Sequence, residues 1–241
     1  METLRLDRTL WPAVALLIGA FVFFEFTDMD LLVQDQLYDF SKQRWLVDAQ
    51  ARGIKLGFYD LPKAGIIAIG LILLTLALGP ERWRARFPIA SPARRNLWVA
   101  FLTLGSVPAL IGQLKATTNT FCPSEIRRYG GDVPYVKVIE SYPSNDRPAR
   151  RGRCFPAGHA SGGFALLALA GIVRSRRGQL TAIGLALAVG WAMGFYQMAK
   201  GAHYLSHTVL TALLAWIGFL LWRRAIRVAQ VQPQTVAAKI P

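Results

Sequence analysis

The sequence predicts an all-α fold, a bundle of six transmembrane helices. Hydrophobic residues make up 53% of the 241 positions. They are concentrated in blocks of about 18 to 20 residues and do not recur at amphipathic spacing, which is typical of membrane-spanning helices. Basic residues cluster at the ends of these blocks, so topology accounts for the formal net charge of +14. We therefore expect a membrane protein with no nucleic-acid partner.

The apolar blocks and the breaks between them define the predicted spans. The first block is kept as a membrane helix because it retains Glu25 at its far end and lacks the small-residue cleavage site of a secretion signal. Gly79-Pro80 ends the second block, and Lys115 ends the third. The predicted spans are 10–26, 61–78, 97–114, 160–173, 180–199 and 205–222.

Polar stretches separate some of these spans. Residues 27–60 carry leucines and aromatic residues that fit either an amphipathic helix on the membrane surface or an ordinary loop helix. Residues 115–156 form the longest polar segment. Residues 1–229 are predicted to form a single membrane domain and residues 230–241 a disordered C-terminal tail. Nothing in the sequence indicates an oligomeric state.

The charge distribution predicts the orientation. Six spans place both termini on one side, and that side also carries the arginine-rich turns 81–96 and 174–179. The positive-inside rule makes this side cytoplasmic. Lys115, His159 and His203 then all fall at the outer face, although more than forty residues separate each from the next. We therefore expect an outward-facing active site.

The chain has three histidines, and all of them lie in two short polar breaks. A single histidine is usually a structural residue, but this confinement favours a catalytic role, because imidazole can attack and transfer protons near neutral pH. An alternative makes His203, His207 and His159 metal ligands, since the first two are four residues apart. With no carboxylate or thiolate close in sequence to complete a site, we expect no metal and no other cofactor.

Three motifs resemble those of the type 2 phosphatidic acid phosphatase superfamily. The first family motif is Lys, six residues, Arg-Pro, and it corresponds here to Lys115, Cys122 and Pro123. The second, Pro-Ser-Gly-His, corresponds to Pro156-Ala-Gly-His159. The third, Ser-Arg, five residues, His, three residues, Asp, corresponds to Tyr196, Gln197, His203 and His207.

The resemblance implies a metal-independent membrane phosphatase that acts on a lipid phosphate through a phosphohistidine. It makes His203 the nucleophile and His159 the proton donor. His207 stands where the family has an aspartate, so it would orient His203 as a neutral acceptor. Lys115, Gly158 and Gln197 occupy phosphate-binding positions. A phosphotransferase with the same intermediate and a catalytically silent protein that binds or moves lipid phosphates remain alternatives.

Two expectations concern Cys122 and Cys154. Both lie in the long outward segment, so in an oxidising periplasm they are expected to form a disulfide. Cys122 and Gln197 also replace two family arginines, so other cations should compensate. The candidates are Arg153 first, because guanidinium suits bidentate phosphate contact, and then Arg127, Arg128 and Lys200. The expected location is a bacterial inner membrane, with the active site on the periplasmic face.

Overall fold

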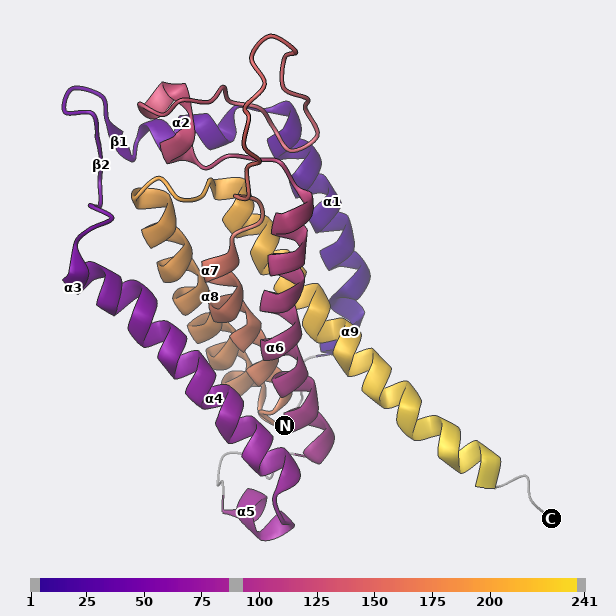
Figure 1. Ribbon diagram of the computed structural model, residues 1–241. Helices are drawn as coiled ribbons and strands as arrows, with labels where there is room; N and C mark the ends of the chain where they lie inside the picture. Colours follow the sequence, from indigo (N-terminus) through magenta and orange to yellow (C-terminus); the bar gives the residue numbers. More distant parts are fainter. Residues whose placement is uncertain (1–4, 87–92, 238–241) are drawn as a thin grey trace.

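The apolar blocks form long helices. The computed structural model describes residues 5–86 and 93–237 (Figure 1). Five segments in this part of the chain are long and apolar enough to cross a membrane, namely Leu6–Phe26, Arg52–Leu78, Arg94–Thr117, Arg176–Ala199 and Leu205–Arg227. They contain the helices α1 (Leu10–Phe26), α4 (Leu61–Leu78), α6 (Arg94–Thr117), α8 (Arg176–Ala199) and α9 (Leu205–Ala237). Large apolar side chains such as Trp11 and Phe26 are exposed on the outside, as expected for lipid-facing residues.

The fourth predicted span, 160–173, differs from the other five. Here the chain forms α7 (Gly158–Ala165), followed by the 3-10 helix η5 (Leu166–Gly171). Eight α-helical and six 3-10 residues extend about 24 Å, less than the hydrocarbon core of about 30 Å. The count of six membrane helices is therefore not confirmed.

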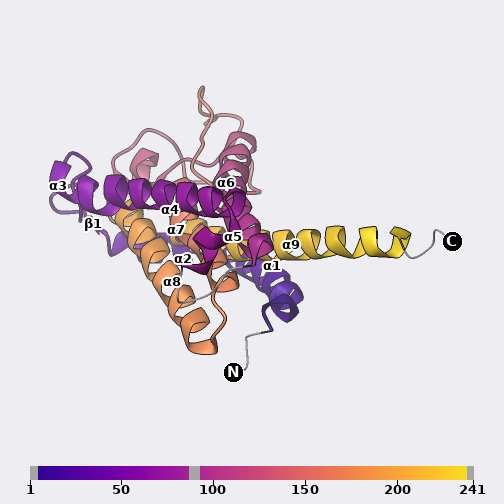
Figure 2. The same ribbon diagram turned by 90° about the horizontal axis from the view of Figure 1, so that it is seen from below.

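The α7–η5 segment is short but lies at the centre of the bundle. It contacts α4, α6, α8 and α9, and the view from below shows α7 among them (Figure 2). Small residues allow this position: a Cβ atom on Gly163 would lie 2.8 Å from the Cα of Gly190 on α8. Phe164 and Ala165 are fully buried. Close helix packing is therefore the role of Gly163.

Residues 27–60 do not form one amphipathic helix. They form α2 (Met29–Asp35), a hairpin of β1 (Tyr38–Asp39) and β2 (Arg44–Trp45), and then α3 (Arg52–Lys55) and the π-helix η2 (Leu56–Asp60). The sequence encodes the hairpin turn, because the Asp39 carboxylate accepts hydrogen bonds from the N–H groups of Ser41 and Lys42. Such local bonds compete with a helix. The α3–η2 segment continues into α4, so the second span begins before residue 61.

The remaining short elements lie at the two ends of the bundle. At one end are η1 (Leu6–Thr9) and α5 (Glu81–Ala85). At the other are the hairpin, α2 and the polar segment 118–157, which contains the short 3-10 helices η3 (Pro123–Glu125) and η4 (Arg127–Tyr129) (Figure 1). A small aromatic core joins the hairpin to this segment, with Tyr38 and Trp45 packed against Tyr129.

The C-terminal helix is longer than its predicted span. Helix α9 is continuous to Ala237, where a disordered tail was expected from residue 230, and residues 238–241 lie outside the described residues. The division into a membrane domain and a tail therefore stays a prediction.

Candidate active site

A short turn between α8 and α9 carries His203 and is held by segments distant in the sequence. Gly201 adopts φ +75°, and a Cβ atom there would lie 2.3 Å from Cε2 of Trp45. Three backbone carbonyls before or within the turn accept hydrogen bonds from outside it. The donors are Gln34 Nε2 to Met198 O (2.7 Å), Val47 N to Ala199 O (3.0 Å) and Ser124 N to Gly201 O (2.9 Å). These contacts fix the backbone that positions His203.

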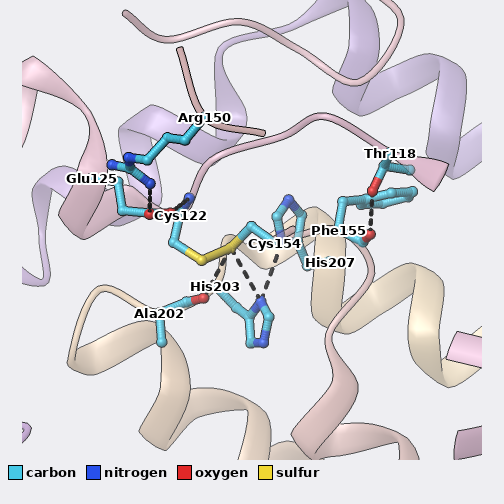
Figure 3. The surroundings of a disulfide bond; sticks show 9 residues. All are labelled: Thr118, Cys122, Glu125, Arg150, Cys154, Phe155, Ala202, His203 and His207. Carbon is cyan, nitrogen blue, oxygen red and sulfur yellow. Dashed lines mark hydrogen bonds and ion pairs between the residues drawn. A yellow bond between two sulfur atoms is a disulfide. The ribbon is translucent and has the colours of Figure 1, made fainter. Parts of the chain in front are cut away.

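His203 and His207 lie side by side at the start of α9. Their Nδ1 atoms are 3.4 Å apart and both side chains are buried. Two Nδ1 atoms at this distance share one hydrogen, and when His203 Nδ1–H donates to His207 Nδ1, His203 Nε2 keeps its lone pair. Figure 3 shows this second ring nitrogen of His203 pointing away from His207. Burial, chiefly, lowers the pKa of His203 well below its ordinary value, which favours the neutral ring.

The start of α7 brings two further predicted residues to this place. The ring centroids of His159 and His203 are 6.1 Å apart. A Cβ atom on Gly158 would lie 3.6 Å from the ammonium nitrogen of Lys115, at the end of α6. The first turn of a helix leaves N–H groups without intrahelical partners, so an ammonium and these groups meet at one point. This arrangement can bind a phosphate.

A cavity of about 480 Å³ lies beside Gly158 and His159. Its walls are mostly apolar and come from α4, α6, α7 and α8, including Ile66, Ile67, Leu104, Pro108 and Met193. Gly158 and His159 lie in its lining, together with Lys63. An apolar chain in this cavity would place a polar end beside His159.

The predicted disulfide is confirmed: Cys122 and Cys154 are bonded, with their Cα atoms 5.2 Å apart. It lies directly against the site, since Cys154 Sγ is 3.5 Å from His203 Nδ1 (Figure 3). Cys122, Cys154 and His203 also form the one group of metal-ligand type found within residues 5–86 and 93–237. Both sulfurs are held in the disulfide, so this group offers no thiolate to a metal ion.

The four candidate cations are placed differently, and Arg127 is paired with Asp146. Arg128 donates two hydrogen bonds to Asp35, at 2.8 and 2.6 Å, and no contact in the described part of the chain joins it to a histidine. Arg153 is exposed beside Cys154 and forms no ion pair with any described carboxylate. The ammonium of Lys200 lies 4.8 Å from the ring centroid of Tyr196. Burial lowers the pKa of Lys200. The structure therefore does not bring Arg128 to the site.

Gln197, which stands at the other arginine position, is buried near the end of α8. Both atoms of its side-chain amide are without a hydrogen-bond partner among the described groups. A buried amide of this kind has an unmet need for a polar contact. This state fits the phosphate-binding role expected for Gln197.

Sequence reasoning missed two residues near the histidines. Lys63 lies over the ring of Tyr59, 5.8 Å from its centroid, and that ring packs against His159 with a centroid distance of 4.7 Å. Asp30 on α2 is buried and accepts a hydrogen bond from the backbone N–H of Ser206, at 2.8 Å. Neither belongs to a recognisable motif. The sequence carries no signal for Asp30, because its burial is a property of the folded structure.

Comparison with known proteins supports one assignment. No curated protein and no solved structure matches the chain. The sequence profile of the PAP2 superfamily matches residues 96–230, more than half of the chain, and this region includes Lys115, His159, His203 and His207. The family expected from the three motifs is thereby confirmed, and the chain belongs to the PAP2 superfamily.

Proposed function

We propose that this protein is a membrane phosphatase that removes a terminal phosphate from a lipid through a phosphohistidine on His203. The observation that carries the proposal is the pair His203 and His207, whose Nδ1 atoms are 3.4 Å apart. This contact leaves Nε2 of His203 as the attacking atom. Membership of the PAP2 superfamily supports phosphatase chemistry. The apolar cavity that reaches His159 supports a lipid as the substrate.

In the first step, the lone pair of His203 Nε2 attacks phosphorus, and the bond between phosphorus and the lipid oxygen breaks. His159 enters this step as the imidazolium and gives its proton to the lipid oxygen, so the lipid leaves as an alcohol, or as a monophosphate if the substrate is a diphosphate. His203 loses its Nδ1 proton toward His207 as its ring gains positive charge. The product is a phosphohistidine.

In the second step, water attacks phosphorus and the bond between phosphorus and nitrogen breaks. His159, now neutral, takes the proton from the water. Inorganic phosphate leaves, and the His203 ring returns to its starting state. Transfer to the hydroxyl of a second lipid instead of water would make the protein a phosphotransferase.

Charge on the phosphate must be offset in both steps. We assign this role to Lys115 and the first turn of α7 at Gly158, which lie close together, with Gln197 as a neutral donor. Arg153 and Lys200 are proposed as additional cations. Arg128 is not, because its guanidinium is engaged by Asp35.

We also propose that the site faces the periplasm of a bacterial inner membrane. The disulfide beside His203 supports an oxidising compartment. The arginines of the opposite end support a cytoplasmic location for that end. This orientation requires the central α7–η5 segment to connect the two faces, in addition to the five long helices.

The direct test is phosphate release by the purified protein from a panel of lipids, measured with and without a chelator. The panel comprises lipid A phosphate, isoprenyl diphosphate, phosphatidic acid and phosphatidylglycerol phosphate. Turnover that resists the chelator supports histidine chemistry. Turnover that needs a metal supports the ligand alternative, and binding without turnover supports the silent alternative.

The nucleophile is tested separately with His203→Ala. Wild type should trap a phosphate that is labile in acid and stable in base, and the variant should trap none and release none. Label that persists on the variant would show that another residue is the nucleophile. The fold of the variant is checked by its thermal unfolding in detergent.

A further inference from the structure

Asp30 connects the N-terminal outer segment to the helix that carries His207. One carboxylate oxygen accepts from the backbone N–H of Ser206, at 2.8 Å, and the other accepts from the Ser206 hydroxyl. Ser206 is the second residue of α9. Asp30 is only 6% exposed. It therefore caps α9 from another helix, one residue before His207, and it lies outside the region that matches the family profile.

Asp30 and His207 both line a cavity of about 20 Å³. This volume suits about one water molecule. The polar groups in its walls come from α1, α2, α9 and the loops 118–157 and 200–204, and they are Glu25, Asp30, Thr120, Tyr135, Lys137, Tyr204, Ser206 and His207. Two of their atoms, Tyr204 Oη and Thr120 Oγ1, are buried without a partner among the described groups. The cavity is thus polar enough to hold a bridging water.

The tautomers of the histidine pair also support a link between His207 and Asp30. If His207 Nδ1 accepts the proton of His203, His207 must carry its own proton on Nε2. That N–H needs an acceptor, and Asp30 and Glu25 are the carboxylates in the cavity wall beside the His207 ring. Glu25 already accepts from the backbone N–H of Ile139, at 3.1 Å, and that of Val138, at 3.3 Å. Both oxygens of Asp30 also accept hydrogen bonds, but their donor is Ser206, the residue next to His207, so Asp30 is the carboxylate bonded to α9 itself.

We propose that Asp30 is a positioning residue for the nucleophile: it holds the first turn of α9 and, across the water-sized cavity, supplies the negative charge that His207 lacks as a replacement for the family's aspartate. This inference rests on the proposed function. The order His203, His207, water, Asp30 would stabilise the positive charge that develops on His203 during attack. Asp30 acts through His207 and does not touch the phosphate.

Burial and the neighbouring groups set the pKa of Asp30. Burial raises its pKa to about 6, against the hydrogen bonds from Ser206 and the charge of Lys137, while Glu25 raises it further. Lys137 is itself paired with Asp28, at 3.1 Å. Tyr135 and Tyr204 also face the cavity and stay neutral at these pH values, because burial raises the pKa of both. A raised carboxyl pKa means that the charge is lost as the pH falls through about 6.

The test compares Asp30→Asn with Asp35→Asn, which removes a half-buried carboxylate, paired with Arg128, from the same helix. Asparagine can still accept from the Ser206 N–H, so Asp30→Asn removes the charge but keeps the cap. We expect kcat to fall about 10- to 100-fold with little change in KM. The wild-type decline in kcat below about pH 6 should be absent from this variant. Asp35→Asn should keep wild-type kcat and its pH profile. A wild-type kcat and pH profile in Asp30→Asn would overturn the proposal.

A second measurement needs no turnover. The chain has three histidines, so ¹⁵N labelling of histidine gives three ring systems to resolve by NMR. Without substrate, Asp30→Asn should shift the ring nitrogens of His207, and Asp35→Asn should not. Unchanged His207 resonances would overturn the role of Asp30 even if the enzyme is active. If wild type hydrolyses no lipid phosphate but the shift is seen, the proposed function fails and the link from Asp30 to His207 stands.

Discussion

Cations in the outer layer and cations around the histidines differ in their partners. In the outer layer, Arg127 pairs with Asp146, Arg128 with Asp35, and Arg150 with both Glu125 and Asp132. Around the histidines, Lys115, Lys63 and Lys200 have no carboxylate partner among the described residues. Two of these lysines lie over tyrosine rings instead, Lys63 over Tyr59 and Lys200 over Tyr196.

The difference separates structural from ligand-binding charge. A guanidinium engaged by a carboxylate joins two segments of chain, but it has little charge left for an added anion. An ammonium without a carboxylate keeps that capacity. Two family arginines are missing from the motifs, so we propose that the unpaired lysines and Arg153, not the carboxylate-paired arginines of the outer layer, replace them.

The largest effect should come from Lys115→Met, which removes the cation at Gly158. We expect kcat/KM to fall about 10²- to 10³-fold, as when one preorganised donor to a developing charge is lost. Arg128→Met is the matched control and should change kcat/KM by less than about twofold, since it removes an exposed ion pair. Equal losses in the two variants would erase the distinction between the two sets of cations.

The next largest effect concerns the disulfide that joins the outer layer to the site. Replacing Cys122 and Cys154 with serine opens a loop with a sequence separation of 32, which should lower the free energy of unfolding by about 3 to 4 kcal/mol. Because Cys154 Sγ touches the ring of His203, kcat should fall as well. Unfolding in detergent without reductant measures the first effect. Unchanged stability and turnover would show that the hydrogen bonds to the turn between α8 and α9 position His203 without the disulfide.

Features with a local or covalent signature were predicted from the sequence. Five of the six spans predicted from the apolar blocks are long apolar helices. The motif spacing predicted the family and placed Lys115, His159 and His203 at one end of the bundle. The disulfide followed from two cysteines in one outward segment. In each case the prediction depends on residue types and their spacing, which are visible in the sequence.

Features that depend on tertiary contact were not predicted. Glycines and alanines let the short helix α7 pack inside the bundle. The hydrophobicity of residues 160–173 therefore reflects burial against other helices, and it predicted a longer helix than the one that forms. The Asp39 turn formed a hairpin where apolar periodicity fitted a helix. Asp30 and Lys63 reach the histidines from segments more than ninety residues away in the sequence, and no local pattern records such an approach.

The burial of His203 should appear in the dependence of stability on pH. Its pKa is lowered in the folded protein, so the unfolded chain binds a proton that the folded state does not once the pH falls below about 6.5. This contribution to stability is present above that pH and is lost below it, by up to about 1.4 kcal/mol per pH unit. His203→Gln should flatten the decline of the unfolding temperature between about pH 6.5 and pH 5. A decline as steep as in wild type would contradict the assignment of this titration to His203.

The smallest effects are expected at the periphery of the site. Lys63, Lys200 and Arg153 are free of carboxylates but are partly or largely open to solvent, so each should contribute to binding more than to the reaction. Their alanine variants should raise KM by about two- to tenfold and leave kcat within about twofold, which corresponds to at most about 1.4 kcal/mol. Arg127→Ala is the control, because its guanidinium is paired with Asp146. Steady-state kinetics at two salt concentrations would sharpen the comparison, since salt should weaken binding less in the lysine and Arg153 variants than in wild type. If all three variants keep the wild-type KM, compensation by these cations is excluded and Lys115 must act with Gln197 and the first turn of α7.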